Sequence, residues 1–176
     1  MRYQGEPVRC RNVRVKDNII YGLRNASSGI ALSGGKNSFS GITISGNQIQ
    51  FPGLQSPVVM MRDKLSFPAG VSFSNNKYFS GLGPSKWFGI GGGKRNMDFK
   101  AWAEASGETG SEAKEVRYRD PSRTVEKYNA SLGGKADFDD FIAQVRKQSK
   151  ATWRREYTAA AVNAYIREGF RPAGAK

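Results

Sequence analysis

Cations and hydroxyls recur at alternate positions of three short apolar segments. Arg14 and Lys16 flank Val15, and the two equivalent positions recur 29 residues further on, twice, as hydroxyl residues. Side chains at alternate positions of a strand project from one face, so two stacked rows are expected, formed by Arg14, Lys16, Thr43, Ser45, Ser72 and Ser74. Guanidinium and ammonium groups beside hydroxyls suit carboxylated or sulfated sugars, because both form charge-assisted hydrogen bonds. An ordinary solvated polar face is the alternative.

The chemistry available elsewhere is narrow because the chain has no histidine. That absence removes the commonest general base, the commonest metal ligand and every Ser-His or Cys-His nucleophile pair. The single cysteine, Cys10, lies 29 residues before Phe39. We therefore expect it to belong to an apolar column and to be buried and inert. Neither a cofactor nor a metal site is expected.

Net charge indicates the class of partner. Twenty-eight Lys and Arg face fifteen Asp and Glu, which gives a formal net charge of +13. This surplus favours polyanions, either acidic polysaccharide or nucleic acid; a soluble surface without a partner is the alternative. No run reaches the ~18 apolar residues that span a bilayer, and the first ten residues lack the apolar region of a signal peptide. We therefore expect no membrane partner.

An internal repeat predicts the fold. Apolar residues return every 29 positions across residues 13–90, and the first two columns are Val13, Ile42 and Val71, then Val15, Ile44 and Phe73. Short alternating segments between turn residues cannot bury an apolar face alone, but stacking them in parallel register makes a continuous core. We therefore predict a mainly β fold, a right-handed parallel β-helix of about three coils over residues 1–93.

Two further expectations follow from the stack. Asn18, Asn47 and Asn76 share the 29-residue period, and stacked amides at a tight turn can form a hydrogen-bonded ladder. The first coil has no neighbour before it, and residues 1–7 are too few and too polar to cover its strand edges. We therefore predict either a longer parent protein or association through the open N-terminal end.

The second half of the chain changes period. Residues 94–120 are predicted to form a final coil or cap and a linker, in which Trp102 plugs the end of the core. Residues 121–176 are predicted to form a helical tail, with helices over residues 121–132 and 157–168 and another helix capped by Asp137. The basic run at residues 146–155 is interpreted as a solvated surface.

The tail also carries motifs of a known family. Residues 99–102 (Phe-Lys-Ala-Trp), 106–111 (Ser-Gly-Glu-Thr-Gly-Ser) and 157–167 resemble the C-terminus of bacterial right-handed parallel β-helix repeat proteins of the pectin-lyase-like superfamily. The resemblance implies the last part of a longer, secreted protein, located extracellularly or in the periplasm. It also implies the chemistry of polysaccharide lyases and glycoside hydrolases, which act on acidic glycans.

The residues restrict that implied chemistry. Calcium-dependent lyases need clustered carboxylates and glycosidases need a matched pair, but the acids of residues 1–93 are only Glu6, Asp17 and Asp63, in different columns. A lyase scheme with a lysine base and an arginine acid leaves Arg62 and Lys64 as catalytic candidates. Whether the chain is an enzyme stays open.

The expected function is a segment that binds or degrades an anionic polysaccharide, without a complete active site. Two alternatives remain. One is a basic, non-enzymatic module for nucleic acid or other polyanions, and the other is an architectural segment of an adhesin or fibre.

Overall fold

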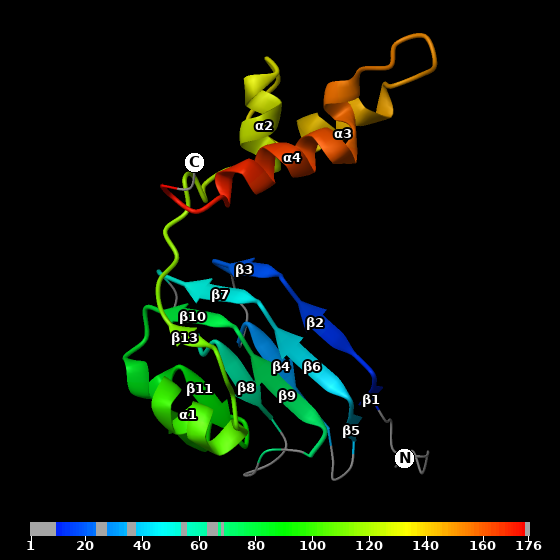
Figure 1. The fold of residues 1–176 in the computed structure, drawn as a ribbon. Coiled ribbons are helices and arrows are strands. Elements are labelled where there is room, and N and C mark those ends of the chain that lie inside the picture. The colour runs from blue at the N-terminus through cyan, green and yellow to red at the C-terminus, as the bar shows by residue number, and fades with distance from the viewer. Residues whose placement is uncertain are drawn as a thin grey trace. The chain divides into compact units, whose positions relative to one another are not determined.

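The computed structural model describes residues 10–23, 28–34, 38–53, 56–62, 67 and 69–174. Contacts divide the chain into two compact units, Met1–Val116 and Arg117–Lys176. We call them the N-terminal and the C-terminal unit and describe each by itself. Figure 1 shows strands in the first and helices in the second.

The N-terminal unit is built from short strands. In chain order these are β1 (Cys10–Arg11), β2 (Arg14–Lys16), β3 (Ile19–Tyr21), β4 (Ile30–Leu32), β5 (Phe39–Ser40), β6 (Ile42–Ser45), β7 (Gln48–Phe51), β8 (Val59–Met61), β9 (Val71–Ser74), β10 (Lys77–Ser80), β11 (Phe88–Ile90), β12 (Arg95–Met97) and β13 (Glu112–Ala113). Among the described residues they form four sheets, ordered β1-β5, β2-β6-β9, β3-β7-β10-β13 and β4-β8-β11-β12. A 3-10 turn (Pro84–Lys86) and helix α1 (Phe99–Ser106) complete the unit.

The 29-residue register is confirmed. Val15 pairs with Ile44 and Ile44 with Phe73, all in parallel strands. Ile44 and Phe73 are buried, as are the equivalent residues Ile49 and Tyr78 in the neighbouring sheet. Apolar side chains of equivalent strands therefore share one core, and residues of all four sheets contribute to it, with Phe39 of β5 packed against its margin.

Two burial expectations for the first strands are wrong. Val13 is 43% exposed. Cys10 does pair with Phe39 as its column predicted, but its side chain is exposed. Cys10 lies on β1 and Val13 lies just before β2, and these are the first strands of their sheets, so a neighbouring repeat covers each residue from one side only.

The fold class predicted from the repeat is also wrong. The described strands fall into four small sheets rather than one continuous β-helix, and about 27% of the described residues are helical against 28% in strands. One sheet is mixed, because β12 runs antiparallel to β11. The reversal has a local cause. Gly91, Gly92 and Gly93 all adopt positive φ, which glycine tolerates without steric cost, and they turn the chain back after β11.

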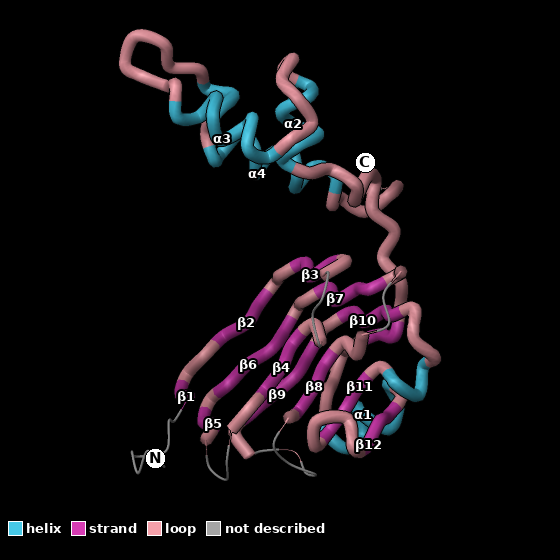
Figure 2. Tube along the Cα trace, turned by 180° about the vertical axis from the view of Figure 1, so that it is seen from behind, coloured by secondary structure: helices cyan, strands magenta, loops and turns pink. Residues whose placement is uncertain are grey.

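Helix α1 covers the end of the core, in agreement with the prediction that Trp102 plugs this end. The Trp102 side chain is fully buried and stacks on Phe88 with 4.7 Å between the ring centroids. Phe73 packs edge-on against the same indole. Figure 2 shows α1 beside β11 and β12. Asp98 caps the helix by accepting a hydrogen bond from the backbone N–H of Ala101 at 2.8 Å.

The C-terminal unit contains α2 (Val125–Ser131), α3 (Phe138–Arg146), a 3-10 turn (Arg155–Tyr157) and α4 (Ala159–Gly169). Each α-helix begins at a capping side chain, and the predicted cap at Asp137 is confirmed: its carboxylate accepts from the N–H of Asp140 at 2.8 Å. Tyr128, Phe141, Tyr157 and Val162 form the buried core of this unit. The predicted helices begin two to four residues too early, because Thr124 and Thr158 are caps rather than helical residues.

Candidate functional site

The predicted rows of cations and hydroxyls lie on the β2-β6-β9 sheet. Arg14 is in register with Thr43, and Thr43 with Ser72. Lys16 is in register with Ser45, and Ser45 with Ser74. Because Val15, Ile44 and Phe73 point into the core, the residues on either side of them project outward. The structure therefore places all six predicted ligand-contact residues at outward register positions on one face of the sheet, which we call the polar face; Ser45 is buried, and the other five are at least partly exposed.

The hydroxyls of the polar face differ in accessibility. The Ser72 hydroxyl donates a hydrogen bond to the backbone carbonyl of Ile42 at 3.2 Å and keeps its acceptor capacity. Thr43 and Ser74 are half-buried. Ser45 is buried, and its hydroxyl has no partner within the described part of the chain. A ligand on this face would therefore meet Arg14, Lys16 and Ser72 first.

The two cations of the polar face are exposed and unneutralised. Neither Arg14 nor Lys16 forms an ion pair with a described residue, although the carboxylate of Asp17 follows directly in sequence. Arg11, on β1 three residues before Arg14, adds an exposed cation along the same strand edge. Sequence analysis missed Arg11 because its column partner, Ser40, lies outside the repeated apolar pairs. Its position one short turn before Arg14 was the available signal.

The catalytic candidates lie elsewhere. Arg62 follows β8, and its backbone N–H donates to the carbonyl of Leu32 at 2.8 Å. It therefore lies just after the end of strand β8 in the β4-β8-β11-β12 sheet and not on the polar face. Lys64, together with Asp63, lies outside the described residues. The described residues therefore do not test the predicted pairing of an arginine acid with a lysine base.

A buried carboxylate was not identified from the sequence as a functional group. Glu108 Oε1 accepts hydrogen bonds from Asn76 Nδ2 at 3.1 Å and the Tyr78 hydroxyl at 2.8 Å, and also from the Ser111 hydroxyl. Its Oε2 accepts from the Trp102 indole N–H at 2.7 Å. We call these five residues the Glu108 cluster. Burial, and secondarily the Glu108 charge, raise the pKa of the Tyr78 phenol above its ordinary value.

The Glu108 cluster terminates the asparagine ladder. Asn18 Nδ2 donates to Asn47 Oδ1, and Asn47 Nδ2 donates to Asn76 Oδ1, both at 3.0 Å. Asn76 Nδ2 then donates to Glu108, where the next asparagine would stand. The predicted ladder is therefore confirmed. Because four side-chain donors already occupy the largely buried carboxylate, Glu108 is best explained as a structural group that holds the end of the stack together.

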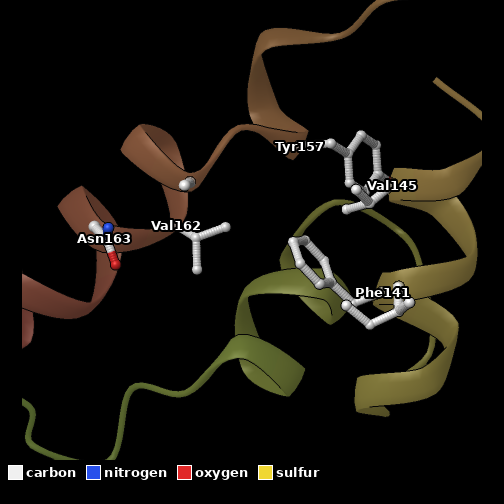
Figure 3. Close-up of a pocket in the computed structure, with 7 residues that line it drawn as sticks. Phe141, Val145, Tyr157, Val162 and Asn163 are labelled. Atoms are coloured by element: carbon white, nitrogen blue, oxygen red, sulfur yellow. The ribbon is translucent and has the colours of Figure 1, made fainter. Parts of the chain in front are cut away.

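The described residues of the C-terminal unit line a groove and an open hollow. The first is a groove of about 280 Å³ between α3 and α4, and Figure 3 shows Phe141 and Val145 of α3 facing Val162 of α4, with Tyr157 beside Val145. Apart from the Tyr157 hydroxyl, the polar group that lines the groove is the Asn163 amide, so the groove offers no charged group to an anion. The second, of about 510 Å³, is open and is lined by Gln148, Ser149, Lys150 and Trp153.

Other classes of site find no support in the described residues. These residues contain no group of three or more Cys, Asp or Glu side chains that could hold a metal ion. None of the helices among them has the length and apolar character needed to cross a bilayer. Comparison with known proteins finds no matching family, no matching curated protein and no matching solved structure.

Proposed function

We propose that the chain binds an acidic polysaccharide through the polar face and does not turn it over. One observation carries the proposal: Arg14 and Lys16 are exposed, project from the same side of β2 and have no carboxylate partner among the described residues. Alternate positions of a strand are about 7 Å apart. Two cations at this spacing can contact successive acidic groups along a glycan.

The surroundings of the two cations suit a sugar better than an isolated anion. Equivalent strands lie about 4.8 Å apart, so Thr43 and Ser72 continue the row that begins at Arg14. The Ser72 hydroxyl donates a hydrogen bond to a backbone carbonyl, so it can accept a hydrogen bond from a sugar hydroxyl. The formal net charge of +13 adds long-range attraction that raises the rate of encounter with a polyanion.

The carboxylates support binding without hydrolysis. Glycoside hydrolysis needs two carboxylates facing the scissile bond, and the one buried carboxylate among the described residues of the N-terminal unit, Glu108, is engaged by its own cluster. The resemblance of residues 106–111 to the closing block of pectin-lyase-like proteins supports an acidic glycan as the ligand. In this chain the same segment supplies Glu108 and Ser111 to the Glu108 cluster.

The test is titration of the full chain with fluorescently labelled oligogalacturonate, with a neutral glucan oligomer of equal length as the ligand control. Replacing both Arg14 and Lys16 by Ala should weaken binding of the acidic oligomer about tenfold, because each lost cation removes an exposed charge-assisted contact. The matched control replaces Lys86 and Lys100, two exposed cations away from this sheet, and should change the affinity less than twofold. Equal losses in both double variants would show that only net charge matters and would refute the site.

A further inference from the structure

The loop between α3 and α4 displays a tryptophan on the surface. We call residues 146–155 the Trp153 loop. Trp153 is 61% exposed, whereas Trp87 is 7% exposed and Trp102 is fully buried. Trp153 belongs to neither hydrophobic core, so its ring is accessible to a ligand. A single exposed ring is ordinary on a protein surface, and its surroundings decide whether it can form a site.

The Trp153 loop is held in one shape by its own polar side chains. Gln148 donates from Nε2 to the carbonyl of Gln144 at 3.1 Å and accepts at Oε1 from the N–H of Arg154 at 2.7 Å. The hydroxyls of Ser149 and Thr152 are 2.9 Å apart, and the Thr152 hydroxyl also donates to the carbonyl of Lys147. These contacts fix the backbone on both sides of Trp153, so little conformational entropy is lost when a ligand stacks on the ring.

All charged side chains of the Trp153 loop are positive. The Trp153 loop contains five cations and no acidic residue: Arg146, Lys147, Lys150, Arg154 and Arg155. Arg154 reaches Glu156 at 3.9 Å and lies over the Tyr157 ring. The other four form no ion pair with a described residue. Lys150 and Trp153 line the same open hollow of about 510 Å³.

We propose that the Trp153 loop is a contact site for single-stranded nucleic acid, with one base stacked on Trp153 and phosphates next to Lys150 and its neighbouring cations. An accessible aromatic ring within a positively charged surface is the arrangement that binds unpaired strands, because every base has a π-face and every linkage carries a charge. The neutral polar side chains that would recognise sugar hydroxyls, Gln148 and Ser149, are already engaged within the loop. That difference favours nucleic acid over glycan here.

This site is independent of the proposed polysaccharide function. Its residues belong to the C-terminal unit, whereas the polar face belongs to the N-terminal unit. The C-terminal unit carries its own excess of cations, with thirteen Lys and Arg against seven Asp and Glu. Failure of either proposal therefore leaves the other standing.

The experiment measures binding of the full chain to a fluorescein-labelled oligothymidylate about fifteen nucleotides long. A second probe is an abasic strand of the same length, which keeps the phosphates and lacks the bases. Trp153→Ala should weaken binding of the oligothymidylate at least ~5-fold, since stacking of a single base on an aromatic ring contributes at least that much. It should leave binding of the abasic strand within about twofold, because no base is present to stack.

Matched variants separate stacking from folding and from charge. Phe138→Ala removes the other strongly exposed aromatic ring of this unit, 50% exposed at the start of α3, and should leave both affinities unchanged. Trp153→Phe should restore most of the lost affinity because it restores a stacking surface. Lys150→Gln should reduce the slope of log affinity against log salt by about 0.7, the value for one phosphate contact on a single strand.

Three results would overturn the proposal. The first is an oligothymidylate affinity that Trp153→Ala leaves unchanged. The second is an equal loss for the oligothymidylate and the abasic strand, which would show that no base stacks on the ring. The third is a loss of oligogalacturonate binding in Trp153→Ala without a loss of oligothymidylate binding, which would assign the loop to an acidic glycan instead.

Discussion

Glu108→Gln is the substitution that most directly perturbs the end of the core. The carboxylate accepts four side-chain hydrogen bonds, three at Oε1 and one at Oε2. A glutamine amide keeps one acceptor oxygen and places N–H groups at the other position. Trp102 can only donate from its indole N–H. If the amide nitrogen takes the Oε2 position, two donors face each other, and if it takes the Oε1 position, the Asn76 amide loses its acceptor.

The magnitude follows from what each orientation loses. A hydrogen bond to a charged group contributes about 1.5–3 kcal/mol, and a buried donor left without a partner costs about 1–3 kcal/mol. Removing the buried charge returns part of its desolvation cost. We therefore expect Glu108→Gln to lower the free energy of unfolding of the N-terminal unit by about 2–4 kcal/mol.

The assay is urea unfolding followed by the indole N–H resonance of Trp102, which reports on this unit alone. Hydrogen exchange at the same indole N–H should accelerate in the variant, because the N–H no longer has a carboxylate acceptor. Glu104→Gln is the matched control. It makes the same chemical change on α1 at an exposed position and should alter stability by less than about 0.5 kcal/mol. Equal stability of Glu108→Gln and the wild type would refute the view that the cluster stabilises the fold.

Three further predictions concern single groups. Asn47→Ala should lower the free energy of unfolding in urea by about 2–4 kcal/mol, because it breaks the buried ladder in both directions. The same change at Asn18, the exposed end of the ladder, should cost less than half as much. Equal costs would contradict a stabilising role of the ladder. The raised pKa of Tyr78 means that the folded state resists ionisation, so stability is retained below the ordinary value of 10.0 and falls by up to ~1.4 kcal/mol per pH unit above it. An absorbance titration in which Tyr78→Phe removes no late-titrating phenol would show this to be wrong. Asp137→Ala should destabilise the C-terminal unit by about 1 kcal/mol through loss of the α3 cap, as measured by helical circular dichroism on heating. Asp139→Ala, in the first turn of the same helix, is the control that should cost less.

The repeat predicted pairing well because pairing depends on local chemistry that recurs. The columns of Val15, Ile44 and Phe73, and of Asn18, Asn47 and Asn76, required only that equivalent residues meet in register, and they do. Burial was less predictable, because it depends on which residues pack around a position, and the repeat period does not specify those residues. Val13 lies just before β2, which has a partner strand on one side only, and Ser45 is buried although its position in the alternation faces outward.

The fold class failed for a different reason. A repeat period indicates which strands are equivalent, but it does not indicate where the chain reverses direction. The glycines at positions 91–93 reverse the chain into the antiparallel strand β12. The 29-residue repeat did not predict the Glu108 cluster either, because Glu108 lies 32 residues after Asn76. Trp153 was read as part of a solvated basic run, since sequence alone does not distinguish a ring packed in a core from one held on the surface.

The central claim is that the polar face binds an acidic polysaccharide, and amide chemical-shift mapping with unlabelled oligogalacturonate tests it most directly. We predict that the largest shifts fall on Arg14, Lys16, Thr43 and Ser72, with smaller shifts on the neighbouring strands, and that they vanish in the Arg14→Ala, Lys16→Ala double variant. Shifts confined to residues 146–155, or an unchanged spectrum at a saturating concentration of the oligomer, would contradict the claim.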